Sequence, residues 1–565
     1  MNYTRTVFAA GLLVSFALAA AEPQLFRFDA PAGPQFSEAE KQAQRARGAG
    51  VVPLVRAAFD SGAEAVTIPP GDYRFGSERY DRDGVVFPLE FSGLQRDDAH
   101  PLLIEAAGAT FWFDLPDDQA PTCHFCVGFK DCRNVVFRGA TIDRATRGHV
   151  EGRITQIDFD NNRIELQLSS GIVVPASFND KLEQRVIPFK ADGAFCAPLY
   201  ALQAGGAHLK YRRISAATAD GRCWVTMADA ALFEAIRGTG LLCVGDGLSC
   251  VYAVTSSLEL IRCSRLTMDG VRVYAPKAWG AEWGGDGAHV WRNCYFGPRP
   301  GTSQWQGGEG FMFCGTRYGA TLENVVIRHT TDDVANFHGY WGHIERVADN
   351  RVTFVRSGEF DRTVLRDITP GDRMLFRDKN SGRPLGEALV ARREDNSVVA
   401  DRLLAAYTNA IVEWPNHACA GWSVSRCDFQ DNYQRLLIQS GPGTVAHCLF
   451  ARQGCGIEIN SDFPYAEGGV ARDIAIVGNT FVDVNPQPGG AAISTHAYTY
   501  GGGVPPFANV FIADNAFVRP GSAAIRLVGF SGGVIASNRF EQVSSPPIEL
   551  LGCSDIREAD NRTAR

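Results

Sequence analysis

Short alternating apolar stretches recur along the C-terminal third of the chain, and a similar three-residue pattern follows each of them. Ile474-Ala475-Ile476 precedes one copy, and Val510-Phe511-Ile512 precedes the next. The copies are Asn479-Thr480-Phe481, Asn515-Ala516-Phe517, Asn538-Arg539-Phe540 and Asn561-Arg562-Thr563. A repeat of about 20 to 40 residues built from short strands, without a long helical pattern, is typical of a parallel β-solenoid whose coils stack about 4.8 Å apart.

Cysteine takes the place of this asparagine further upstream. The copies of the pattern that begin with cysteine are Cys294-Tyr295-Phe296, Cys427-Asp428-Phe429 and Cys448-Leu449-Phe450. We expect the asparagines to be turn residues or members of an amide ladder. We expect the recurring cysteines to be buried free thiols, and a minority of them can form disulfides. They are Cys132, Cys263, Cys294, Cys427 and Cys448. Cys123 and Cys126 have metal-type spacing, but no second pair matches them, so we expect no metal site there.

Other stretches predict a cap and two insertions. Helical spacing over Pro53 to Ser61, followed by a strand at Ala65 to Ile68 and a Pro-Gly turn, predicts a cap over the first coil. Hairpin patterns around Asp160-Asn161-Asn162 and Ala348-Asp349-Asn350-Arg351 predict small antiparallel modules. The predicted fold is all-β: a right-handed parallel β-helix with an N-terminal cap and two small antiparallel β-barrel-like insertions.

The N-terminus has the features of an export signal. Arg5 precedes an apolar run from Val7 to Ala20, and small residues at Ala17 to Ala21 offer a cleavage site. The run is too short to span a membrane. We therefore expect an exported, periplasmic or secreted protein without a membrane span. The predicted boundaries are 1–21 signal peptide, 22–146 cap and first coils, 147–250 first insertion, 251–342 coils with the candidate acids, 343–416 second insertion and 417–565 C-terminal coils.

Composition narrows the classes of function. The net charge is −8, and no basic run is present, so nucleic acid is not an expected partner. A hydrophobic share of 45% and 59 glycines fit a turn-rich folded protein and exclude general disorder. No loop has the ligand spacing of a Ca²⁺ site, so we expect no cofactor, although a structural Ca²⁺ ion is compatible with an acidic exported solenoid. The sequence gives no signal for an oligomeric state.

The strongest candidate chemistry lies in Thr331-Asp332-Asp333-Val334-Ala335-Asn336-Phe337-His338-Gly339. Glu309 lies 23 and 24 residues upstream of the two aspartates, which is one coil of the predicted solenoid. Repulsion among close carboxylates keeps one of them protonated near neutral pH, so one site can contain an acid and a base. The alternative is that Asp332 caps a turn, Asp333 pairs with an arginine and Glu309 is a solvated loop residue.

Nearby polar and aromatic residues are candidates for sugar contacts. His338 and Asn336 follow the acids, and Trp305 and Trp341 flank them. Each tryptophan fits packing as well as sugar stacking, and His338 fits a turn histidine equally well. Three residues roughly one coil below Glu309 either line the same groove or lie in a loop, and the loop is favoured: Glu282, Asp286 and His289. Trp414-Pro415-Asn416-His417 closes the second insertion, either at the pocket edge or as junction packing.

These motifs resemble glycoside hydrolase family 110. The resemblance rests on Glu309-Gly310-Phe311-Met312-Phe313 and the Asp332 to Gly339 segment, with looser similarity at Asp431 to Ile438, at Asn460 to Phe463 and at Glu467 to Val470. It implies an exo-acting α-1,3-galactosidase on a parallel β-helix, more distantly similar to polygalacturonases. Glu309 stands where the family has Asp, and Tyr433 and Leu436 stand where it has Arg and Gly.

The resemblance also implies roles. Hydrolysis would proceed with net inversion, Asp332 acting as general acid while Asp333 and Glu309 position the attacking water. Arg435 and Glu467 would bind hydroxyls of the terminal sugar, and Asp462 serves either sugar binding or a turn. The leading hypothesis is thus an exported exo-glycosidase that acts on a glycan. A polysaccharide lyase and a non-catalytic carbohydrate-binding solenoid are the alternatives, and the fold does not decide between them.

Overall fold

The computed structural model describes residues 34, 36–76, 87–114, 126–144, 149–169, 172, 174, 185–196, 209–251, 257–274, 280–300, 302, 308–356, 360–380, 382–404, 407, 410–461, 467–484, 491–497, 507–543 and 546–564. The expected signal peptide lies outside these residues, as do Cys123, Trp305 and Asp462. Among the described helices, none has the length and apolar character needed to cross a membrane.

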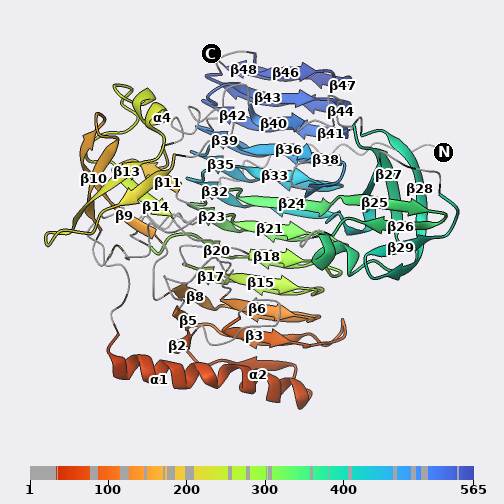
Figure 1. Cartoon of the computed structure of the whole chain (residues 1–565), viewed down its shortest axis with the longest axis horizontal. Helices are drawn as coiled ribbons and strands as arrows, with labels where there is room; N and C mark the ends of the chain where they lie inside the picture. The colour runs from red at the N-terminus through yellow and green to blue at the C-terminus, as the bar shows by residue number, and fades with distance from the viewer. Residues whose placement is uncertain are drawn as a thin grey trace, which may run out of the picture.

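The chain coils through three long sheets, here named A, B and C, which confirms the predicted parallel β-helix (Figure 1). Sheet A has the order β1 (Ala65–Thr67), β4 (Leu102–Glu105), β7 (Val135–Arg138), β16 (Thr267–Asp269), β19 (Val290–Arg292), β22 (Thr321–Glu323), β31 (Trp422–Ser425), β34 (Gly443–Ala446), β38 (Arg472–Val477), β41 (Phe507–Ala513), β44 (Phe530–Ala536) and β47 (Ser554–Ala559). Sheet B has the order β2 (Gly71–Gly76), β5 (Ala109–Asp114), β8 (Thr141–Arg144), β17 (Arg272–Val273), β20 (Tyr295–Phe296), β23 (Val326–Arg328), β32 (Asp428–Gln430), β35 (Leu449–Ala451), β39 (Thr480–Val482), β42 (Ala516–Val518), β45 (Arg539–Glu541) and β48 (Arg562–Ala564). Sheet C has the order β3 (Leu89–Ser92), β6 (Val127–Lys130), β15 (Leu258–Ile261), β18 (Gly280–Trp283), β21 (Phe311–Cys314), β24 (Ala335–Tyr340), β33 (Leu436–Gln439), β36 (Ile457–Ser461), β40 (Ala491–Ala497), β43 (Ala523–Val528) and β46 (Ile548–Leu551), and β37 (Glu467–Gly468) joins it by pairing with β24.

The repeated tripeptides build ladders inside the solenoid. The side-chain amides of Asn479, Asn515 and Asn538 each donate to the next asparagine along the stack at 3.0 Å, ending at Asn561. The phenylalanines two residues later stack in sheet B, with ring centroids 4.8 Å apart for Phe450–Phe481 and for Phe481–Phe517. The five recurring cysteines are buried free thiols, as predicted, and the main-chain N–H of Cys427 donates to Cys448 Sγ at 3.4 Å.

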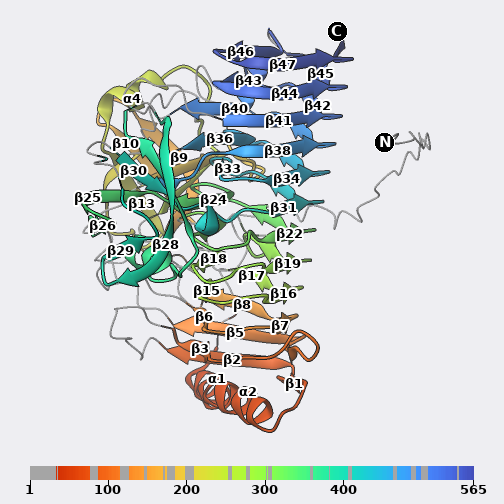
Figure 2. The same ribbon diagram turned by 90° about the vertical axis from the view of Figure 1, so that its right-hand side faces the viewer.

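Two helices cap the first coil (Figure 2). The predicted helix is α2 (Val51–Asp60), whose buried Val51 and Val55 pack into the solenoid core. A second helix that the pattern did not indicate, α1 (Glu38–Ala49), precedes it and begins with a capping box between Ser37 and Glu40. The strand and turn that follow are as predicted, since β1 and β2 flank Ile68 to Pro70.

The first insertion is a six-stranded antiparallel sheet with its own core. Its order is β11 (Arg185–Phe189), β14 (Gly247–Val251), β9 (His149–Asp158), β10 (Arg163–Leu168), β13 (Arg222–Met227) and β12 (Tyr211–Ile214), and α4 (Ala230–Ala235) packs on it through Phe233. β9 and β10 form the predicted hairpin, with Asn162 in the left-handed conformation.

The second insertion is a closed barrel. Its order is β25 (Gly342–Ala348), β26 (Arg351–Phe354), β29 (Ser397–Ala400), β28 (Pro384–Glu394), β27 (Arg373–Asp378) and β30 (Ala410–Glu413), with a π-helical turn at Asp361–Leu365 and a 3-10 turn at Pro415–His417. β25 and β26 form the other predicted hairpin, with Asp349 in the left-handed conformation.

The insertions lie on opposite sides of the strands of sheet C in Figure 1, with β9–β14 at the left and the barrel at the right. The first insertion contacts the solenoid where Phe195 packs on Tyr433, with ring centroids 5.6 Å apart. The barrel covers the outer face of sheet C, because Met312 and Tyr340 share one apolar cluster with the barrel residues Phe354 and Val364. Asp332 and Asp333 lie just before β24 of sheet C, in the corner that follows β23 of sheet B.

Candidate active site

The Asp332-Asp333 pair occupies the corner between β23 and β24, at the start of a rung of sheet C. Backbone hydrogen bonds define the coil below the pair. Thr331 N–H donates to the main-chain carbonyl of Gly308 at 3.3 Å, and Gly310 N–H donates to the main-chain carbonyl of Asp333 at 2.9 Å. Glu309 is thus in the coil directly below the pair, at the same corner. Arg435 lies in the coil above, since Val334 N–H donates to its carbonyl at 2.7 Å.

Arg435 lies between two carboxylates. Its Nε is 3.5 Å from Asp333 Oδ1 and 3.3 Å from Glu458 Oε2. Glu458 also accepts from the side-chain amide of Asn460 at 2.9 Å. The sequence reasoning missed Glu458, although a signal existed: it is the polar position between the inward-facing Ile457 and Ile459, in register with Asn336 two rungs below.

Asp333 is the carboxyl group of this cluster whose pKa is shifted upward. Burial raises its pKa well above the ordinary value, and the charges of Asp332, Glu458 and Glu467 raise it further, while Arg435 opposes the shift. The residue is 4% exposed, whereas its neighbour Asp332 is partly exposed. Two adjacent carboxyl groups in different environments are the arrangement that separates an acid from a base.

Glu467 reaches the cluster from β37, which pairs antiparallel with the end of β24. Its Oε2 accepts from Asn336 Nδ2 at 3.3 Å. The two backbones approach closely at Gly339 and Gly468: a Cβ on Gly339 would lie 3.0 Å from the Gly468 carbonyl, and one on Gly468 would lie 2.5 Å from Trp341 Nε1. Gly468 also has φ +151°, a conformation that favours glycine.

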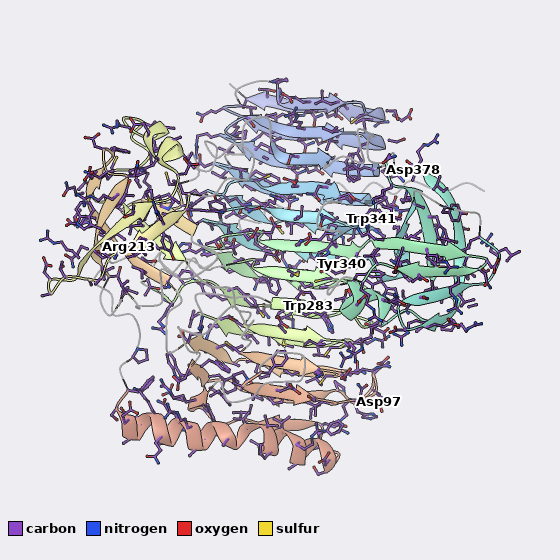
Figure 3. The ribbon with its side chains drawn as sticks, viewed as in Figure 1. Asp97, Arg213, Trp283, Tyr340, Trp341 and Asp378 are labelled. Carbon is purple, nitrogen blue, oxygen red and sulfur yellow. The ribbon has the colours of Figure 1, made fainter. Side chains whose placement is uncertain are left out.

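Three predicted sugar contacts are buried: Trp341, His338 and Asn336. Trp341 is 1% exposed and packs with Ile411 and Val470, so its ring has no free face for a sugar. Figure 3 shows it beside Tyr340, where β24 runs into the barrel. His338 is fully buried, with Nδ1 2.9 Å from the carbonyl of Gly339 and its ring edge-on to Tyr340. The side chains of Trp341 and His338 are therefore enclosed by protein groups.

Of the three residues one coil below Glu309, Glu282 and His289 are placed differently from both sequence interpretations, whereas Asp286 lies in a turn, as the favoured interpretation expects. Glu282 lies in β18 in the position that faces the solenoid interior, and Trp291 Nε1 donates to its Oε1 at 2.9 Å. Burial raises the pKa of Glu282 to about 8. His289 is likewise buried, which lowers its pKa to about 3, and its Nδ1 accepts from Leu266 N–H. These two residues belong to the core, and Asp286 is exposed on the turn between them.

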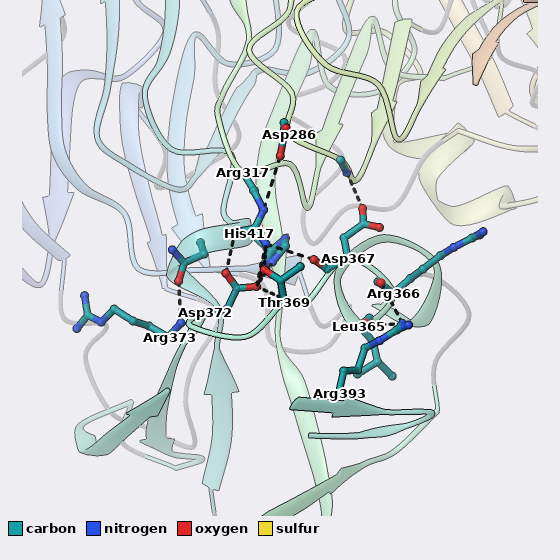
Figure 4. A network of polar contacts seen from close by, with 12 residues as sticks. Asp286, Arg317, Leu365, Arg366, Asp367, Thr369, Asp372, Arg373, Arg393 and His417 are labelled. Atoms are coloured by element: carbon teal, nitrogen blue, oxygen red, sulfur yellow. Dashed lines mark hydrogen bonds and ion pairs between the residues drawn. The ribbon is translucent and has the colours of Figure 1, made fainter. Parts of the chain in front are cut away.

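A polar network fixes the barrel to the turns of the solenoid (Figure 4). Arg317, from the turn after β21, contacts Asp372 Oδ1 at 2.7 Å, and His417 Nε2 lies 3.0 Å from Asp372 Oδ2. These contacts hold the pKa of Asp372 below its usual range despite the opposing effect of burial. His417 and Trp414 are both buried, and Trp414 packs on Phe354. The segment therefore packs at the junction, one of the two expectations for it.

Within the described residues, no group of three or more His, Cys, Asp or Glu side chains is arranged to hold a metal ion. The chain matches no family model, and no curated protein matches its sequence.

Three solved structures illustrate the architectural likeness. The A-module of mannuronan C-5 epimerase AlgE6 of Azotobacter vinelandii is 10% identical, with 95% of this chain and 98% of that chain covered and a TM-score of 0.40. An exopolygalacturonase of Thermotoga maritima is 11% identical, with 90% and 86% covered and a TM-score of 0.34. PfbA, a surface adhesin of Streptococcus pneumoniae, is 8% identical, with 95% and 88% covered and a TM-score of 0.31.

Proposed function

We propose that this protein is an exported glycoside hydrolase that removes a terminal α-linked galactose from glycans with inversion of the anomeric centre. The observation that carries the proposal is the pairing of a buried carboxyl, whose pKa burial raises, with a more exposed neighbour: Asp333 with Asp332. A buried titratable group with a shifted pKa that lies beside other acids is a candidate for a catalytic role. Galactose and the α-1,3 linkage come from the family resemblance alone.

In the proposed reaction, a protonated carboxyl donates to the glycosidic oxygen as the C–O bond breaks, and an ionised carboxylate takes a proton from the attacking water. The electrostatics favour Asp333 as the proton holder, where the resemblance alone assigned that role to Asp332. Asp332 and Glu309, both partly exposed at the same corner, are then the candidates for activating water. Arg435 and Glu467 are charged side chains beside the acids and bind hydroxyls of the terminal sugar.

The roles can be tested with two variants. An acid variant, Asp333→Asn, is expected to lose activity by about 10²- to 10⁴-fold on natural glycans but far less on aryl glycosides, whose leaving groups need no proton. A base variant, Asp332→Asn, is expected to lose activity on both substrates and to recover it with azide, a nucleophile that needs no base. Aryl glycoside hydrolysis equally impaired in both variants would reject the assignment of Asp333.

A lyase is the weaker candidate for this site. Such an enzyme would need an unprotonated base, and Arg435 is the basic residue that contacts the acids among the described residues. The neighbouring carboxylate of Glu458 favours the charged form of Arg435, which suits Arg435 to binding and not to proton abstraction. Ultraviolet absorbance from an unsaturated product would nevertheless identify a lyase directly, and glycan binding without turnover would identify a binding protein.

A further inference from the structure

We propose that Glu413, in the barrel, is a positioning residue that clamps the segment carrying Glu467 into the acid cluster. The barrel then has a defined role, because it holds one wall of the site in place. The catalytic consequence rests on the proposed function, whereas the clamp itself rests on contacts alone.

Both carboxylate oxygens of Glu413 are used. Oε2 accepts from Arg377 Nε at 2.5 Å, and the side chains of Glu413 and Arg377 are 3% and 5% exposed. Oε1 accepts from the main-chain N–H of Val470 at 3.2 Å and from Arg472 Nη2 at 2.8 Å. Arg377 is itself held by the Gly382 carbonyl at 3.0 Å. Glu413 thus connects the barrel interior to the backbone three residues after Glu467.

The clamped segment has little freedom at one end and open space at the other. Glu467 and Gly468 pair with Tyr340 and Gly339, where the close approach at Gly468 fixes the backbone. Further along, a cavity of about 220 Å³ adjoins the segment, and its lining includes Glu413, Ser440, Gly469, Val470 and Arg472. Val470 packs with Trp341 and Ile411 on one side and adjoins this cavity on the other, so the hydrogen bonds to Glu413 add to that packing in holding Val470 and, through it, Glu467.

The charge of Glu413 is necessary for the clamp. Removing one partner of a buried ion pair leaves the other charge without compensation, so Glu413→Gln leaves Arg377 facing a neutral amide. The amide also presents only one acceptor oxygen to three donors. The segment is then expected to shift, and displacement of supporting groups by about 1 Å typically lowers catalysis about 10- to 100-fold.

The experiment is a double-mutant cycle read out by kinetics and by hydrogen exchange. The variants are E413Q, E467Q and E413Q/E467Q in the full chain, with D114N as control. Asp114 contacts Arg74 at 2.6 Å beside the cap, and Arg74 is as buried as Arg377, so D114N disrupts a comparable ion pair far from the site. Kinetics use a terminal α-galactoside, and hydrogen exchange follows the peptides that contain residues 467–472.

We expect E413Q to lower kcat/KM about 10- to 100-fold, to speed exchange at 467–472, and to add little further loss to E467Q. D114N should leave both kcat/KM and the exchange at 467–472 unchanged. A folded E413Q with unchanged exchange at 467–472, or with effects additive to E467Q, would overturn the clamp. If E413Q fails to fold, R472M removes one contact and leaves the Arg377–Glu413 pair intact; it should speed the same exchange, and unchanged exchange there would also overturn it. Should the wild type hydrolyse nothing, the proposed function fails, while exchange still decides the clamp.

Discussion

Glu282 offers a prediction whose size follows from the structure. This carboxyl lies inside the solenoid, fully buried, and accepts a hydrogen bond from Trp291 Nε1. Burial raises its pKa from an ordinary 4.5 to about 8. At neutral pH the folded protein therefore keeps this carboxyl protonated, whereas the unfolded chain releases the proton.

The sign and size of the effect follow from proton linkage. Because the folded pKa is raised, stability is greatest below pH 4.5, is lost as the pH rises from 4.5 to 8, and is then constant with respect to this group. At about 1.4 kcal/mol for each pKa unit, the whole loss is about 5 kcal/mol, of which about 3 kcal/mol has accrued by pH 7. Glu282→Gln keeps an acceptor for Trp291 and abolishes the titration.

We therefore expect Glu282→Gln to be more stable than the wild type by about 3 kcal/mol at pH 7 and by about 1 kcal/mol at pH 5. Urea unfolding followed by tryptophan fluorescence at pH 5, 7 and 8.5 measures the difference. Glu387→Gln is the control, since Glu387 is 54% exposed in the barrel and should show no such dependence. A variant less stable than the wild type at pH 7, or a difference that does not grow with pH, would refute the reasoning.

Three further predictions concern the ladder, the close backbone approach and the acid. Asn538→Ala removes a side-chain amide that donates to Ile512 and Asn561 and accepts from Asn515. In urea titrations it should lower the free energy of unfolding by about 2 to 4 kcal/mol. The control, Asn509→Ala at an exposed position, should lower it by less than about 1 kcal/mol. Gly468→Ala places a Cβ 2.5 Å from Trp341 Nε1 and should lower kcat/KM at least about 10-fold, whereas Gly552→Ala, which has φ +61° and nothing within 4 Å, should leave kcat/KM unchanged. Asp333→Asn should remove the alkaline limb of the pH profile of kcat/KM, because the raised pKa of Asp333 sets that limb; an unchanged limb would place the proton elsewhere.

The β-helix fold could be predicted from the sequence because its tripeptide pattern repeats at coil-length spacing. The Asn479 position recurs at coil length, and an amide ladder needs only that spacing, so the ladder was one of the two expectations for the asparagines; the stacking of Phe481 with its neighbours was not predicted. The helix α1 was missed because it buries only Gln44 and Gly48 and so has no apolar stripe, although Ser37 and Glu40 carried a capping-box signal.

The only part of the site that the sequence predicted was the set of residues that lie one coil length apart. Spacing placed Glu309 below Asp332, but it does not say which face of a strand a residue occupies, so Glu282 was assigned outside the core. Placing Glu458 beside the acids requires the register of three successive rungs, which runs from Asn336 through Leu437 to Glu458. The burial of Trp341 depends on how the barrel docks, and no local pattern contains that information.

The most direct test of the central claim is monosaccharide release by the purified protein from a panel of terminal α- and β-linked glycans, with Asp333→Asn in parallel. Our account predicts galactose from α-1,3-linked substrates, formed initially as the inverted anomer, and a loss of at least about 100-fold in the variant. Release of no monosaccharide from any glycan, or equal release by the variant, would contradict it.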